Sequence, residues 1–192
     1  MNLLLRFSRM IDIMNEKIGQ TIYWLILFAV IIGAGNATIR YIFSTSSNAW
    51  LEIQWYLFSG VFLLGAGYTH LRNEHIRIDV FSGKLSRRGQ TWLDIIGTVI
   101  FLLPMAIGIM VLSWPMVIDS MSRMEMSTDA GGLIRWPIKL VIPVGFSLLA
   151  LQGISELIKR VAFLMGLAPD PAEKTHGAHG APAPVADPEA AP

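Results

Sequence analysis

The chain has 192 residues, of which 53% are hydrophobic and only 15% charged, against about 45–50% and about 25% in a typical soluble domain, so the composition is that of a membrane protein. Its 15 basic and 14 acidic residues leave a net charge of +1, which argues against a nucleic-acid or polyanion partner. The absence of cysteine excludes disulfides, thiolate metal ligands and cysteine nucleophiles.

The first 17 residues predict an amphipathic helix that lies in the membrane surface. Leu4, Ile11, Met14 and Ile18 fall on one helical stripe, while the charged residues lie elsewhere. A solvated N-terminal segment is the alternative. A cleaved signal peptide is disfavoured, because the apolar run that follows exceeds the usual h-region of about 7–15 residues.

Four apolar segments are each long enough to cross a hydrocarbon core of about 30 Å as a helix. They cover residues 21–39, 51–69, 95–112 and 140–158. Between the second and the third, Asp79 is a candidate N-cap of a short amphipathic segment. We therefore expect an all-α membrane domain of four transmembrane helices over residues 1–166, followed by a disordered Ala/Pro-rich tail over residues 167–192.

Positive charge is divided unevenly between the two ends of these helices. Eleven of the 15 Lys and Arg residues lie on the side of the termini, namely Arg6, Arg9, Lys17, Arg72, Arg77, Lys84, Arg87, Arg88, Lys159, Arg160 and Lys174. The other side has Arg40, Arg123, Arg135 and Lys139. Because loops rich in Lys and Arg stay in the cytoplasm, we expect both termini to be cytoplasmic.

Small residues and prolines mark helix contacts within the spans. Ala29, Gly33 and Ala37 recur at four-residue spacing and predict close approach of another helix, either within this chain or in another subunit. Pro104 and Pro143 lie inside the third and fourth spans, where each predicts a kink that serves packing.

Ionisable side chains are few within the spans, and they lie near the span ends. Glu52, with Gln54 beside it, lies near the outer end of the second span, where it can pair with Arg40 or contact a partner protein. Near the inner end of the fourth span, Gln152 and Glu156 are one turn apart, and we expect Glu156 to pair locally with Lys159 and Arg160.

The sequence offers no pattern of a catalytic or cofactor site. His70 and His75 lie at one membrane border and His176 and His179 in the tail, so they do not predict haem ligands facing each other across a bundle. Phosphate-binding loops and catalytic triads are not visible either. We predict that the chain is not an enzyme and binds no cofactor or metal.

Two stretches carry a family resemblance. They are RYIFSTSSNAWLEIQWYLF followed by FLLGAGYTHLRNEHIRIDVF, within 40–81, and GGLIRWPIKLVIPVGFSLLALQGISELIKR, 131–160. The first resembles the signature region of the small membrane subunit of tripartite ATP-independent periplasmic (TRAP) transporters, the DctQ family, and the second resembles its last span. The matching residues are Arg40, Tyr41, Phe43, Trp50, Glu52, Gly65, Ala66, His75, Ile76, Asp79 and Val80. The likeness covers roughly residues 15 to 165.

The resemblance implies a sodium-driven uptake system of the bacterial inner membrane. A periplasmic binding protein would deliver a carboxylate-type solute to a large permease subunit, and this chain would scaffold that subunit. Candidate interface or structural residues are Ala29, Gly33, Ala37, Arg40, Trp50, Glu52, Gly65, His75, Asp79, Gln152 and Glu156. For docking of the binding protein, the outer loop offers both signs of charge in Arg123, Glu125, Asp129 and Arg135.

Two other classes of function fit the sequence less well than the scaffold does. A self-sufficient four-helix transporter acting as a homodimer would use Glu52 as its coupling carboxylate, but Glu52 is expected near the outer interface and not at the midplane. A membrane-anchor subunit of a quinone-linked oxidoreductase would need histidines on facing helices, which the sequence does not predict.

Overall fold

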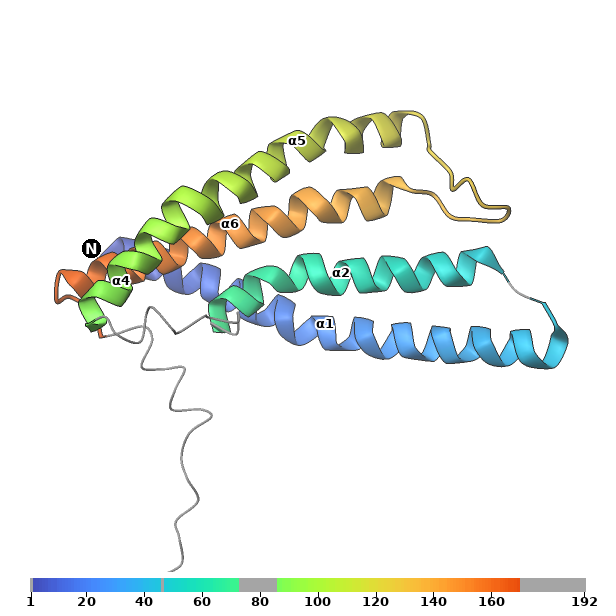
Figure 1. Ribbon diagram of the computed structural model, residues 1–192, viewed down its shortest axis with the longest axis horizontal. Helices are drawn as coiled ribbons and strands as arrows, with labels where there is room; N and C mark the ends of the chain where they lie inside the picture. Colours follow the sequence, from blue (N-terminus) through green and yellow to red (C-terminus); the bar gives the residue numbers. More distant parts are fainter. Residues whose placement is uncertain (1, 46, 73–85, 170–192) are drawn as a thin grey trace, which may run out of the picture.

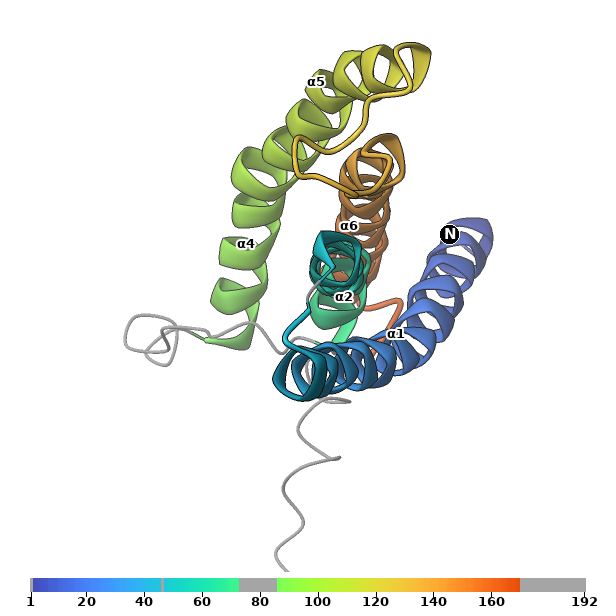
Figure 2. The same cartoon turned by 90° about the vertical axis from the view of Figure 1, so that its right-hand side faces the viewer.

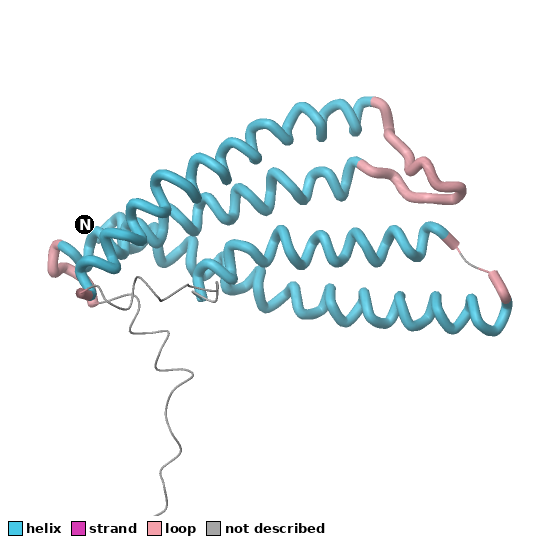
Figure 3. Tube along the Cα trace, in the orientation of Figure 1, coloured by secondary structure: helices cyan, strands magenta, loops and turns pink. Residues whose placement is uncertain are grey.

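The computed structural model describes residues 2–45, 47–72 and 86–169, and these ranges are helical apart from loops and one isolated β-bridge (Figures 1 and 3). The helices are α1 (Asn2–Phe43), α2 (Asn48–Arg72), α4 (Arg87–Gly97), the π-helical segment η1 (Thr98–Leu102), α5 (Leu103–Ser122) and α6 (Trp136–Leu164). The all-α prediction is thus confirmed for the described ranges. His75, Asp79 and residues 170–192 of the predicted tail lie outside them.

Three stretches of helix are long and apolar enough to cross a membrane: 3–43 in α1, 87–122 in α4 to α5, and α6. They contain the first, third and fourth predicted spans. The second predicted span forms α2, which has 25 residues and a length of about 38 Å. Its mean hydropathy is lowered by polar residues that include Glu52 and Gln54 in its second turn and His70 in its last turn. Its passage through the membrane remains a prediction.

Helix α1 combines two segments that the sequence predicts as separate helices. The predicted surface helix and the first span form one helix of 42 residues, about 63 Å long and therefore about twice the thickness of the hydrocarbon core. Figure 2 shows that this helix curves along its length. Of the predicted stripe, Leu4 and Met14 are exposed, as lipid-facing side chains are, whereas Ile11 is buried. Placement in the membrane surface remains a prediction.

Helix α6 is the centre of the bundle. In its most apolar segment of 18 residues, 50% of the residues are buried. The corresponding share is 17% in α1 and 11% in the α4 to α5 stretch. Figure 2 shows α6 and α2 in the middle, with α1 on one side and α4 and α5 on the other. The buried side chains of Ala106, Leu149 and Ala150 form a small apolar core between α5 and α6. The remaining apolar surface of α1 and α5 faces outward.

The small-residue stripe of α1 meets α2 within this chain. Ala29 is fully buried, and a Cβ added at Gly33 would lie 2.9 Å from the Gln54 side chain of α2. Gly65 of α2 lies beside Ile22, with 3.7 Å between an added Cβ and the Ile22 side chain. Ala37, in contrast, is exposed. Two of the three stripe residues therefore serve packing inside the chain, and Ala37 remains a candidate contact to another subunit.

Glycines allow α6 to approach its neighbours closely. At Gly145 an added Cβ would lie 2.5 Å from the backbone carbonyl oxygen of Leu63 in α2. At Gly153 it would lie 2.7 Å from a methyl group of Leu102 in η1. The contact at Gly145 is with the backbone of α2, and close approach of this kind is typical of membrane helices, whose association depends on close packing. The two contacts leave no room for a side chain at either position.

A π-helical turn lies just before Pro104, where the sequence predicts a kink. Proline has no N–H group and cannot complete the regular hydrogen-bond pattern of a helix. Just before it, the Leu103 N–H donates to the Thr98 carbonyl oxygen, five residues back. Pro143 lies buried inside α6, where the Ser147 hydroxyl donates to its carbonyl oxygen at 2.6 Å. Both prolines are therefore accommodated within helices.

The chain end and the loops that the structure describes are divided between the two ends of the bundle. The N-terminus and the end of α6 lie together at one end (Figure 1). The α1–α2 connection and the loop 123–135 lie at the opposite end (Figure 1). This arrangement agrees with the predicted order of helices, in which both termini share one side of the membrane.

Candidate functional site

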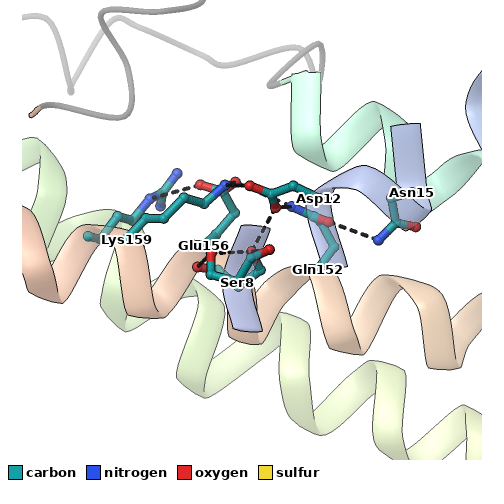
Figure 4. A network of polar contacts seen from close by, with 8 residues as sticks. Ser8, Asp12, Asn15, Gln152, Glu156 and Lys159 are labelled. Atoms are coloured by element: carbon teal, nitrogen blue, oxygen red, sulfur yellow. Dashed lines mark hydrogen bonds and ion pairs between the residues drawn. The ribbon is translucent and has the colours of Figure 1, made fainter. Parts of the chain in front are cut away.

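A group of buried polar side chains joins the N-terminal part of α1 to the C-terminal half of α6 (Figure 4). We call it the α1–α6 cluster, and its members are Ser8, Asp12, Asn15, Gln152, Ser155, Glu156 and Lys159. On each helix the members recur at intervals of three or four residues, which places them on one face. Two polar faces thus meet between α1 and α6.

Two serine hydroxyls and one carboxylate form a chain of hydrogen bonds in this cluster. The Oγ atoms of Ser8 and Ser155 are 2.7 Å apart, and Ser155 Oγ is 2.7 Å from Asp12 Oδ1. Because an ionised carboxylate can only accept, Ser155 donates to Asp12 and Ser8 donates to Ser155. Both serines are almost completely buried.

Gln152 occupies the centre of the cluster. Its amide nitrogen donates to Asp12 Oδ1 at 2.9 Å, and its amide oxygen accepts from Asn15 Nδ2 at 2.8 Å. Both amides are fully buried, a position that costs free energy unless the hydrogen bonds are made. The other side of Asn15 faces Gly67 of α2. Asn15 therefore lies where α1, α2 and α6 meet.

The charged members pair across three helices. Lys159 Nζ lies 3.0 Å from Asp12 Oδ2 of α1 and also pairs with Glu156 of its own helix. The neighbouring Arg160 lies 3.0 Å from Asp94 of α4 and 4.0 Å from Glu156. The predicted local pairing of Glu156 is therefore confirmed. The partners on α1 and α4 are additional, and they connect the elements around α6.

A second polar group lies at the opposite end of the bundle, where the loop 123–135 folds onto α2. We call it the loop cluster; it comprises Asn48, Glu52, Tyr56, Glu125, Ser127, Leu133, Ile134, Arg135 and Lys139. Glu52 Oε2 accepts from the Leu133 backbone N–H at 2.6 Å, and Oε1 accepts from the Ser127 hydroxyl. Tyr56 donates to the Ile134 carbonyl oxygen at 3.2 Å. Side chains of α2 thus fix the loop 123–135 by hydrogen bonds to its backbone and to Ser127.

The suggested Arg40–Glu52 pair is wrong. Glu52 binds the loop, and Arg40 is an exposed residue of the last turn of α1. The physical reason is that the folded loop presents a backbone N–H and a hydroxyl directly to the carboxylate. A carboxylate bound by such donors gains strong hydrogen bonds without fixing a long, flexible arginine side chain.

The four candidate docking residues of the loop differ in how firmly they are held. Glu125 pairs with Lys139, and this contact together with the Ser120 hydroxyl holds the pKa of Glu125 below its ordinary value. Arg135 lies 3.5 Å from Ser127 Oγ. Arg123 forms an exposed ion pair with Asp119 at 2.8 Å, and Asp129 is exposed. Arg123 and Asp129 are the members most accessible to a docking protein.

A small cavity of about 210 Å³ opens beside the loop cluster. Its walls are Glu52, Trp55 and Tyr56 of α2, Arg135, and Ile138 and Lys139 of α6. Trp50, another candidate interface residue, is 45% exposed in the first turn of α2. Within the described ranges, no group of three or more His, Cys, Asp or Glu side chains is arranged to hold a metal ion.

Comparison with known proteins gives one match. The family model described as the DctQ component of tripartite ATP-independent periplasmic transporters matches residues 28–163. This range contains α2 to α5 entirely, residues 28–43 of α1 and nearly all of α6. No curated protein and no solved structure shows significant similarity to the chain.

Proposed function

Since the chain belongs to the DctQ family and is therefore a small permease subunit of a TRAP transporter, we propose that it acts as a rigid scaffold for the large permease subunit. In this proposal the large subunit contains the transport path. A periplasmic binding protein delivers a carboxylate-type solute, and sodium drives uptake. The solute class and the coupling ion follow from the family resemblance of the sequence.

The pairing of buried polar groups inside the bundle is the observation that carries the scaffold proposal. Lys159 pairs with both Asp12 and Glu156, and the Gln152 amide nitrogen donates to the same two carboxylates. Groups that are satisfied in this way tie helices together. The outward surface is apolar in contrast, with Phe101 exposed to 72%, and suits lipid or another membrane subunit.

We expect the chain to copurify with its large permease subunit as a stable complex when the two are expressed together. The reason is that the apolar faces of α1 and α5 are exposed in this chain, so a second membrane subunit can bury them by close packing. The complex is measured by size-exclusion chromatography with mass determination. A stable homodimer that does not bind the large subunit would contradict the scaffold and favour the self-sufficient transporter.

We further propose that both termini lie in the cytoplasm, because the end with the termini carries most of the positive charge. The natural chain has no cysteine, so one introduced cysteine is labelled uniquely. In intact cells, a membrane-impermeant maleimide should label Thr128→Cys in the loop 123–135. Ala168→Cys, just beyond α6, should react only after the membrane is opened. The reverse pattern would overturn the orientation.

A further inference from the structure

The cavity beside the loop cluster combines charged groups with an exposed apolar surface. Of its charged wall residues, Lys139 is paired with Glu125, and Glu52 is bound by the loop. Arg135 is held more weakly. Its side chain makes a long hydrogen bond of 3.5 Å to Ser127, although a guanidinium has five N–H donors. Among the described residues, Arg135 is therefore the cationic wall residue without a direct ion pair, although the nearby Glu52 and Glu125 carboxylates attract it.

An apolar stripe leads away from this cavity along α2. Leu51, Trp55, Phe58 and Phe62 are exposed, and Trp55 and Phe62 are the most exposed at 72% and 76%. These positions fall on one helical face. No other residue of α2 from 51 to 71 is exposed. Trp55 belongs both to the stripe and to the cavity wall, so the two surfaces are continuous.

The depth of these residues matches the layers of a lipid monolayer. Glu52 and Lys139 lie four and three residues inside the starts of α2 and α6, or about 5–6 Å along the helices. The headgroup layer on each side of a bilayer has a similar thickness, about 5–7 Å. Phe62 lies about 15 Å farther along α2 than Glu52, which places it in the hydrocarbon core when α2 crosses the membrane as the sequence predicts. These depths are the same whichever side of the membrane this end of the bundle faces.

We propose that this cavity is a binding site for one phospholipid. The guanidinium of Arg135 binds the phosphate, and an acyl chain lies along Trp55, Phe58 and Phe62. The surrounding charges balance, with Glu52 and Glu125 against Arg135 and Lys139, so the site fits a zwitterionic headgroup better than an anionic one. A primary ammonium, as in phosphatidylethanolamine, can also donate to the remaining lone pairs of Glu52.

The test is lipid binding to the purified, delipidated full chain, measured by native mass spectrometry during titration with phosphatidylethanolamine. We expect one lipid to bind, and Arg135→Gln to weaken binding about tenfold or more, because a charge-assisted hydrogen bond to phosphate is lost. The matched control is Arg123→Gln on the same loop, which should bind as the natural chain does. Equal binding by both variants would overturn the proposal.

A second pair of variants does not depend on the loop. Trp55→Ala removes the exposed wall between cavity and stripe and should weaken lipid binding. Trp24→Ala removes a tryptophan of α1 that is similarly exposed, at 61%, and should not. Two further results would overturn the proposal: tighter binding of phosphatidylglycerol than of phosphatidylethanolamine, and displacement of the lipid by millimolar succinate, which would assign the cavity to a carboxylate solute.

Discussion

Replacing Asp12 by alanine is expected to destabilise the chain strongly. The change leaves Lys159, Gln152 and Ser155 without the carboxylate that all three share. Breaking a buried ion pair costs about 3–5 kcal/mol, and we expect about 3 kcal/mol because the Asp12 and Lys159 side chains are 25% and 22% exposed. The measurement is the loss of helical circular dichroism on heating the detergent-purified chain, which should occur at a clearly lower temperature.

An exposed ion pair provides the matched control. Asp119 pairs with Arg123 at 2.8 Å, and both side chains are more than half exposed, so Asp119→Ala should cost at most about 1 kcal/mol. In the double variant Asp12→Ala with Lys159→Ala, the loss of stability should be smaller than the sum of the two single losses, because both single changes remove the same Asp12–Lys159 ion pair. Equal melting temperatures for Asp12→Ala and Asp119→Ala would show that the α1–α6 cluster does not tie the helices.

Replacing Gly145 by alanine is expected to have the second largest effect. The added methyl group would lie 2.5 Å from the Leu63 carbonyl oxygen and 2.8 Å from its carbonyl carbon. These are backbone atoms, so the contact is relieved only if α2 and α6 move apart. Overpacking of this kind costs about 1–3 kcal/mol, and the melting temperature of the purified chain should fall accordingly.

Gly108 of α5 is the control for this substitution, because an added Cβ there has no neighbour within 4 Å. Alanine favours helix by about 0.5–1 kcal/mol over glycine, so Gly108→Ala should be neutral or stabilising. If Gly145→Ala were as stable as Gly108→Ala, close packing between α2 and α6 would not be what holds the centre of the bundle.

The helices were predictable from the sequence because hydrophobic length is a local signal. The predicted segments 95–112 and 140–158 both lie within longer observed helices, 87–122 and Trp136–Leu164. The exact ends were less predictable. A membrane helix continues past the hydrocarbon core wherever it can still pack against a neighbour, and apolar length alone does not report that.

The α1–α6 cluster was missed because its two halves lie about 140 residues apart in the sequence. The spacing of Ser8, Asp12 and Asn15 was visible, but a polar stripe on an amphipathic helix equally suits a water-facing surface. This stripe can be buried because Gln152 and Ser155 on the facing helix supply hydrogen-bond partners for it. Their amide and hydroxyl groups were the available signal, since buried polar groups of one helix need partners on another.

Glu52 shows a different limit of sequence reasoning. Its carboxylate was correctly placed near one end of the bundle, but its partners come from the loop 123–135. That loop depends on backbone geometry, including Gly131 with a φ of 72° and Met124 with a φ of 48°. Proximity in sequence favoured Arg40, whereas the folded loop supplies the backbone N–H of Leu133.

Solute uptake by proteoliposomes tests the central claim, that this chain scaffolds transport without performing it, most directly. Vesicles would contain this chain, the large permease subunit, or both, with the binding protein and labelled solute outside and a sodium gradient directed inward. We predict uptake only when both subunits are present, because the charged side chains of the α1–α6 cluster pair with one another and leave none of them to bind a solute. Uptake by this chain alone, or full uptake by the large subunit alone, would contradict the claim.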